Sequence, residues 1–125
     1  MGYQQALEAA GAKVLNFWEF GSYQGDWVAQ VECDGSVKWV KGGYGSCSEC
    51  DAFQSEFGYL DEEKPGYQKR LAEFGKSYLS DAQPLEAILK GFYETASWDS
   101  DAKEAIETLE PFLGKQLRLR KGSAK

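Results

Sequence analysis

The fold is decided by the stretch DWVAQVECDGSVKWVK, residues 26–41. Residues 26–33 alternate between apolar and polar side chains, which is typical of a β-strand with one buried face. Asp34-Gly35 is the strongest turn signal in the chain, because both residues suit the positive φ angles of a tight hairpin. Residues 37–41 predict a second strand, so the stretch as a whole predicts a β-hairpin.

The register of this hairpin depends on the length of its turn. A two-residue turn pairs Cys33 with Ser36 and leaves Trp39 on the face opposite to Trp27. A three-residue turn pairs Cys33 with Val37 and gathers both tryptophans on one face. Turn chemistry favours the first register and burial favours the second. We expect the second, because a slip of one residue moves every side chain of a strand to the wrong face.

The segments around the hairpin predict the rest of an α+β fold. Apolar residues at helical spacing over 3–10 predict an N-terminal helix, and residues 13–20 predict the first strand of a meander. Further apolar stripes predict a helix that Ser48 caps, a helix over 67–78, a helix that begins at Ser80 and Asp81, and a last helix after 97–100. We therefore expect an N-terminal helix, a three-stranded antiparallel meander, and a helical C-terminal half packed on one face of the sheet.

The C-terminal end carries two further signals. Pro111 is expected to mark the final turn of the last helix, because proline interrupts helical hydrogen bonding. The alternating residues 116–120 suggest a short edge strand. The basic stretch from about residue 115 to 125 has little to pack, so we expect a frayed tail on a single domain that spans residues 1–125.

Composition bounds the class of protein. The aromatic content of 14% supplies a core and leaves a surplus for a binding surface. No apolar run is long enough for a transmembrane helix, and the first residues show no signal-peptide pattern. We therefore expect a cytoplasmic protein that does not bind membranes and whose three cysteines are reduced.

The charge is unevenly distributed along the chain. The net charge is −6, and the last 11 residues contain five basic residues and no acid, so residues 1–114 carry −11. An acidic body repels phosphate backbones, so we expect it to bind no nucleic acid. It complements a basic surface on a partner protein, and the alternative is that the charge serves only solubility. The oligomeric state is left open.

Cys47 and Cys50 form a CxxC pair in the motif YGSCSECD, between a predicted strand and a predicted helix. Three interpretations remain open: a redox dithiol, a structural zinc site completed by Cys33, and simple packing residues. The neighbours Glu49 and Asp51 oppose thiolate formation, and the chain has no histidine to complete a zinc site.

Two loops of the predicted meander converge at one end of the sheet. The loop in FGSYQGDW, residues 20–27, and the loop after the third strand both lie at the end opposite to Asp34-Gly35. This convergence predicts a polar binding edge. Its candidate residues are Tyr23, Gln24, Asp26, Tyr44, Ser46, Glu49 and Asp51. The alternative is that the two loops pack on each other and their side chains bond backbone groups.

Catalysis has less support than binding. Without histidine the commonest general base is missing. Asp26, Asp34, Glu49 and Asp51 could supply a carboxylate-dependent hydrolase, but their spacing does not show that they converge. The sequence therefore favours a non-enzymatic binding module, with a cysteine-centred metal or redox protein as the alternative and a hydrolase as a further alternative.

The segments FGSYQGDW and YGSCSECDAF together resemble a paired motif of small uncharacterised proteins of bacteriophages and bacteria. In that group the second segment typically has glycine where this chain has Glu49. The resemblance covers residues 13–57 and carries over no catalytic residue. It implies a small phage accessory protein in the host cytoplasm, of the kind that inhibits host defence as anti-CRISPR and other anti-defence factors do.

Overall fold

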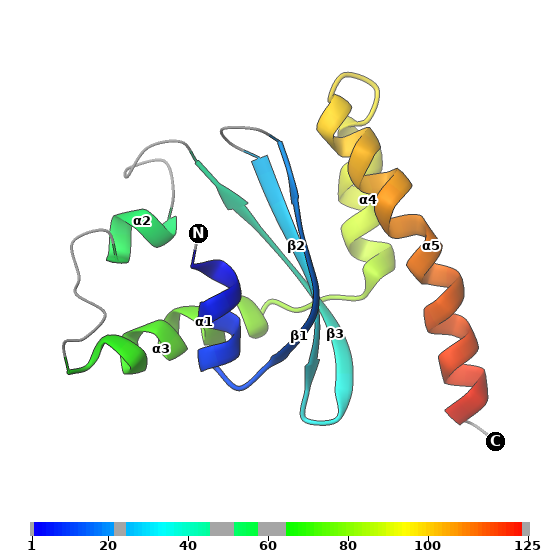
Figure 1. Ribbon diagram of the computed structural model, residues 1–125. Helices are drawn as coiled ribbons and strands as arrows, with labels where there is room; N and C mark the ends of the chain where they lie inside the picture. The colour runs from blue at the N-terminus through cyan, green and yellow to red at the C-terminus, as the bar shows by residue number, and fades with distance from the viewer. Residues whose placement is uncertain (1, 22–24, 46–51, 58–64, 124–125) are drawn as a thin grey trace. The chain divides into compact units, whose positions relative to one another are not determined.

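The computed structural model describes residues 2–21, 25–45, 52–57 and 65–123, which form an α+β fold (Figure 1). The elements in chain order are α1 (Tyr3–Ala9), β1 (Lys13–Phe20), β2 (Gly25–Cys33), β3 (Ser36–Tyr44), α2 (Ala52–Phe57), α3 (Tyr67–Leu79), α4 (Leu85–Thr95) and α5 (Ser100–Ser123). The predicted order of an N-terminal helix, a three-stranded antiparallel sheet and a helical C-terminal half is confirmed. The chain forms two compact units, Met1–Gln83 and Pro84–Lys125.

The sheet has the strand order β1-β2-β3, and both neighbouring pairs are antiparallel. The hairpin between β2 and β3 has a two-residue turn, in which Asp34 and Gly35 adopt φ angles of 53° and 78°. Cys33 pairs with Ser36, so the expected pairing of Cys33 with Val37 is wrong. The turn chemistry of Asp-Gly decided the register.

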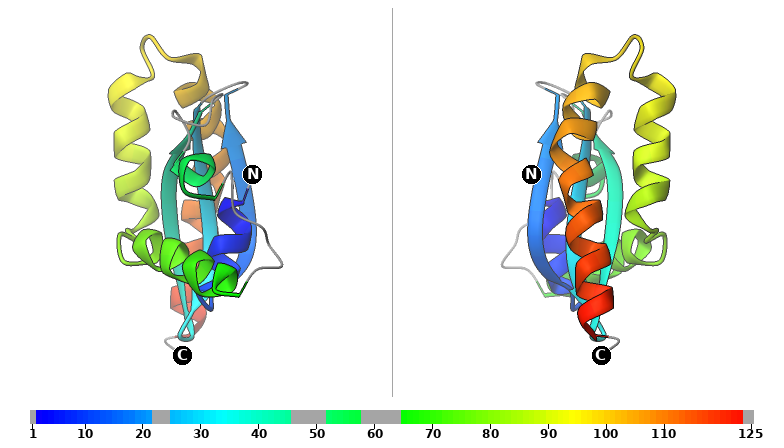
Figure 2. Two further views of the ribbon diagram at one scale, coloured as in Figure 1. Left: turned by 90° about the vertical axis from the view of Figure 1, so that its left-hand side faces the viewer. Right: turned by 90° about the vertical axis from the view of Figure 1, so that its right-hand side faces the viewer.

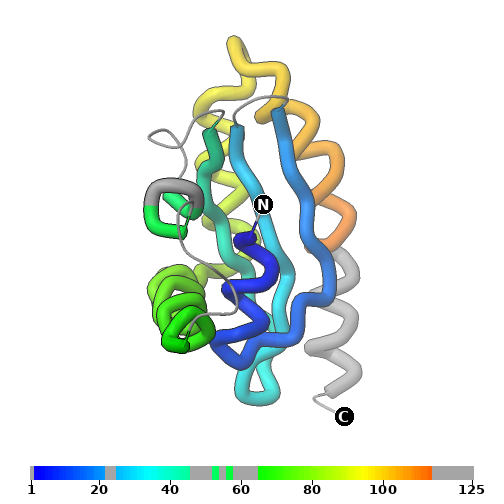
Figure 3. Tube along the Cα trace, turned by 60° about the vertical axis from the view of Figure 1, so that its left-hand side comes forward, coloured from blue at the N-terminus to red at the C-terminus, as the bar shows by residue number. Residues whose placement is uncertain are grey.

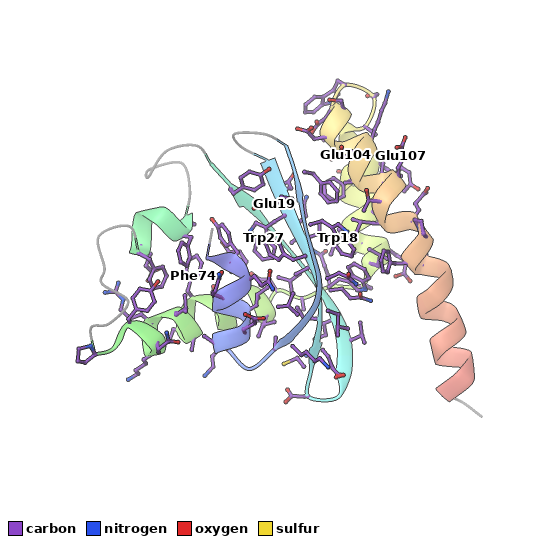
Figure 4. The ribbon with its side chains drawn as sticks, viewed as in Figure 1. Trp18, Glu19, Trp27, Phe74, Glu104 and Glu107 are labelled. Carbon is purple, nitrogen blue, oxygen red and sulfur yellow. The ribbon has the colours of Figure 1, made fainter. Side chains whose placement is uncertain are left out.

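Burial did not decide the register, because the sheet has buried side chains on both faces. Trp27 and Ala29 lie on one face, and Val28 and Trp39 lie on the other, yet all four are buried. Trp18 stacks on Trp39 with ring centroids 5.9 Å apart, and Figure 4 shows Trp18 and Trp27 on opposite sides of the sheet. A slip that moves Trp39 to the other face was therefore not needed to bury it.

Helices α1, α2 and α3 lie on the Trp27 face of the sheet (Figures 2 and 3). The predicted stripe on α3 is confirmed, because Tyr67 and Leu71 are buried and Phe74 and Tyr78 pack against the core. Gly75 lets α1 and α3 approach closely: a Cβ atom at this position would lie 2.0 Å from the carbonyl oxygen of Ala6. The close packing of α3 on α1 thus requires a residue without a side chain at their crossing.

The connection between α3 and α4 corrects one predicted boundary. Ser80 and Asp81 were expected to begin a helix, but their amides donate hydrogen bonds to the carbonyls of Lys76 and Tyr78, which end α3. The amide of Gln83 then bonds the Trp39 carbonyl on β3 at 3.0 Å. Helix α4 begins only after Pro84, whose fixed φ of −67° suits a helix start.

In the second unit, α4 and α5 form a helical hairpin (Figure 1). Both helices bury an apolar face, made of Leu85, Ile88, Leu89 and Phe92 on α4 and of Ala102, Ala105, Ile106 and Leu109 on α5. These residues are spaced three and four apart, as the sequence predicts.

Helix α5 is longer than expected. Pro111 lies inside it, although it was predicted to mark the final turn, and the backbone stays helical through Ser123. The predicted edge strand over 116–120 is therefore wrong. The residues there are glutamine, leucine and arginine, which favour helix, and an alternation of five residues is too short to outweigh that preference.

Within the ranges that the structure describes, no helix has both the length and the apolar character that a membrane crossing requires.

Candidate functional site

The described ends of the two predicted loops meet at one end of the sheet. Gly25 pairs with Tyr44, and Asp26 pairs with Gly43. The Tyr44 hydroxyl donates a 2.8 Å hydrogen bond to the Gly21 carbonyl, and the ring of Tyr44 is buried in the core. Tyr44 therefore ties the start of one loop to the end of β3.

The remaining candidates at this end lie outside the described residues, and a binding role for them stays a prediction. They are Tyr23, Gln24, Ser46, Glu49 and Asp51.

Cys33 lies at the opposite end of β2 from Tyr44. Its Sγ atom is 3.9 Å from an oxygen of Asp34. Cys47 and Cys50 fall outside the described residues, so a zinc site with Cys33 and a redox role both stay predictions. Among the residues that are described, no three Cys, Asp or Glu side chains gather closely enough to hold a metal ion.

Two of the four acids proposed for a hydrolase, Asp26 and Asp34, fall in the described residues, and they lie far apart. Asp26 is at the start of β2 and Asp34 is in the turn that follows it. A strand rises roughly 3.3 Å per residue, so the two carboxylates are at opposite ends of a strand roughly 25 Å long. They cannot act on one substrate atom.

The aromatic side chains of the first unit gather in its core. Tyr3 is the centre of this cluster, with ring centroids 5.2 Å from Trp27, 5.8 Å from Phe53, 6.0 Å from Phe74 and 5.9 Å from Tyr78. Many of the described aromatic residues of the first unit therefore fill this core. The exposed large apolar side chains of the described chain are Leu15, Val37, Tyr93 and Trp98.

Trp98 is the most exposed of these four, with 76% of its surface accessible. It sits in the turn between α4 and α5, where the amides of Trp98 and Asp99 both donate to the Thr95 carbonyl at 3.1 and 2.9 Å. An oxygen of Asp99 accepts the Asp101 amide at 3.0 Å and so caps α5. The backbone on both sides of Trp98 is held by hydrogen bonds, so the indole is presented from an ordered turn.

The surroundings of Trp98 are acidic. Glu94, Asp99 and Asp101 lie within four residues of it, and Glu104 and Glu107 follow on α5 (Figure 4). Residues 84–114 contain seven acidic and two basic residues. Tyr93 is 52% exposed, and its hydroxyl donates a hydrogen bond to the Glu110 carboxylate across the hairpin. We call the surface formed by two aromatic and five acidic residues the hairpin-tip surface: Tyr93, Trp98, Glu94, Asp99, Asp101, Glu104 and Glu107.

Trp98 is not among the site residues predicted from the sequence. The signal was present, because a tryptophan between Ser97 and Asp99 interrupts the helical stripes on either side and has no apolar neighbour in sequence. Such a residue cannot join the apolar face of either helix, so it must lie outside the hairpin core.

Comparisons of the chain with protein-family models, with curated proteins and with solved structures found no match.

Proposed function

We propose that the protein is a non-enzymatic binding module that occupies a basic surface of a partner protein through the hairpin-tip surface. The observation that carries this proposal is the 76% exposure of Trp98 on a hydrogen-bonded turn among carboxylates.

An exposed tryptophan on an ordered turn is a favourable contact residue. Tryptophan is enriched among the residues that dominate binding energies, because its large rigid ring buries much apolar area at little cost in side-chain entropy. Its π face also attracts arginine and lysine side chains. The surrounding carboxylates strengthen that preference, since they attract the same cations and repel acidic partners.

The resemblance to phage proteins suggests one form of this function. A phage-encoded inhibitor of host defence, of the anti-CRISPR or another anti-defence type, would act on a protein whose groove binds nucleic acid and is therefore basic. An acidic surface with an aromatic centre would compete with the nucleic acid for that groove.

The first test uses a defined cationic probe. A tetra-arginine peptide is titrated into the isotopically labelled protein, and the indole N–H signals of the four tryptophans are followed by NMR. The variant Trp98→Phe identifies the Trp98 signal by its absence. We expect this signal to move with the arginine peptide and to stay in place with tetra-citrulline, which is similar in shape but uncharged. Equal responses to both peptides, or none, would contradict the proposal.

The second test concerns the protein partner. Proteins captured from a host lysate by the wild type are compared with those captured by Trp98→Ala and by Val37→Ala, which removes an exposed apolar side chain of the other unit. With a captured protein purified, we expect Trp98→Ala to weaken binding about tenfold or more and Val37→Ala to leave it unchanged. Binding of the wild type should weaken as salt is raised. Equal binding by both variants would exclude the hairpin-tip surface.

A further inference from the structure

A groove of about 510 Å³ lies among α1, α2 and α3 in the first unit. Its described lining residues are Gly2, Gln5, Glu8, Ala9, Phe53, Tyr67, Gln68 and Leu71. This volume is within the usual range of small-molecule sites, roughly 300–1,000 Å³. The described lining contains no residue of the hairpin-tip surface, so a ligand of the groove would bind at a different site from the proposed protein partner.

The floor of the groove is apolar and held in place. Tyr67 and Leu71 are buried, and Phe53 packs against the core. The Phe53 amide donates a 3.2 Å hydrogen bond to the Tyr3 hydroxyl. A Cβ atom on Gly2 would lie 1.9 Å from the Phe53 ring, so the ring rests directly on the Gly2 backbone. These contacts fix α2 against α1 and form an aromatic floor.

The polar lining is acidic and neutral. Gln5, Glu8 and Gln68 are exposed, and within the described part of the chain their side chains have no hydrogen-bond or ion-pair partner. No lysine or arginine is among the described lining residues. Arg70 is on the same helix as Gln68, but its guanidinium pairs with Glu56 at 3.7 Å. The Glu8 carboxylate is thus left without a compensating cation in the described lining.

We infer that this groove binds a small amphipathic cation, a primary amine carried on an aryl or alkyl group. The aromatic floor takes the apolar body, and the Glu8 carboxylate takes the ammonium group. The side-chain amide oxygens of Gln5 and Gln68 can accept further hydrogen bonds from the ammonium group. The first unit contains thirteen acidic and seven basic residues, so its field favours a cation and opposes an anion of the same shape.

The test compares three probes of one shape and different charge. Phenethylamine, phenethyl alcohol and phenylpropionate are titrated into the full-length protein, and binding is measured by ligand-observed saturation-transfer NMR. We expect phenethylamine to bind most tightly and phenylpropionate not to bind. Equal binding of the amine and the alcohol would overturn the role of Glu8, and absence of amine binding would overturn the site.

Matched variants locate the interaction. Glu8→Gln removes the charge inside the groove, and Glu73→Gln removes one from an exposed position of α3 outside the described lining. We expect Glu8→Gln to raise the Kd of phenethylamine about fivefold, and Glu73→Gln and Trp98→Ala to leave it unchanged. Equal effects of the two Glu→Gln variants would show attraction by the general field, which overturns the proposed site.

A steric variant supplies an independent check. Ala9→Leu places a larger side chain in the groove without a change of charge, and we expect it to abolish amine binding. Thermal unfolding of this variant verifies its fold, and if it does not fold, the result for Glu8→Gln still decides the proposal.

Discussion

The two compact units place their aromatic side chains in opposite ways. In the first unit, Tyr3, Trp27 and Phe74 join one buried or partly buried cluster. In the second unit, Phe92 is buried, whereas Tyr93 and Trp98 are exposed. A high aromatic content therefore does not by itself indicate a binding surface. An aromatic residue that is held in a polar turn, away from every apolar stripe, is the more specific sign.

The largest effect is expected from the core tryptophan. Trp27 is fully buried against Phe17 and Tyr3, so Trp27→Ala should lower the free energy of unfolding by about 3–5 kcal/mol. Trp98→Ala removes the same side chain from an exposed turn and should change it by less than about 0.5 kcal/mol. Denaturant unfolding of both variants measures the difference. Similar losses would break the contrast between the two units.

A smaller effect is expected where glycine allows two helices to meet. Gly75→Ala places a methyl group against the Ala6 carbonyl, so we expect a loss of about 2 kcal/mol even though alanine favours helix. The matched variant Gly35→Ala meets no atom within 4 Å, but its φ of 78° strains any side chain, and we expect about 1 kcal/mol. Denaturant unfolding ranks the two. A larger loss for Gly35→Ala would show that α1 and α3 can move apart easily.

The smallest effect concerns the hydroxyl of Tyr93. Tyr93→Phe removes the hydrogen bond to Glu110 between the exposed faces of α4 and α5. Because water can replace this bond, the loss of stability should be about 0.5 kcal/mol. Chemical denaturation monitored by the helical circular dichroism signal provides the measurement. If the Trp98 indole signal of this variant no longer moves with the arginine peptide, Tyr93 orders the hairpin-tip surface.

Much of the fold could be predicted from local patterns. The bounds of β1 agree with the prediction, and the predicted apolar stripe Tyr67, Leu71, Phe74 and Tyr78 packs in the core. The failures have two causes. The register at Cys33, the role of Ser80 and the strand at 116–120 each depended on what the segment meets in three dimensions or on competing local preferences, and periodicity does not report either.

The candidate sites were harder to predict than the fold. The pairing of Gly25 with Tyr44 follows from meander topology, which is why the convergence of the two loop ends could be expected. The groove beside Glu8 could not be expected, because its lining comes from α1, α2 and α3, and their crossing depends on close contacts at Gly2 and Gly75. Trp98 could have been found from its polar neighbours alone.

The order of the helices and strands through α3, the Asp34-Gly35 turn and the separation of charge along the chain can be read from the sequence, because these follow from neighbours within a few residues. The burial of Tyr3, Trp27 and Trp39, and the presence of buried apolar side chains on both faces of the sheet, depend on the tertiary structure. It also decided that Glu8 lines a groove with an aromatic floor. The burial of these three residues and the groove depend on contacts between residues far apart in the chain, which local patterns do not contain.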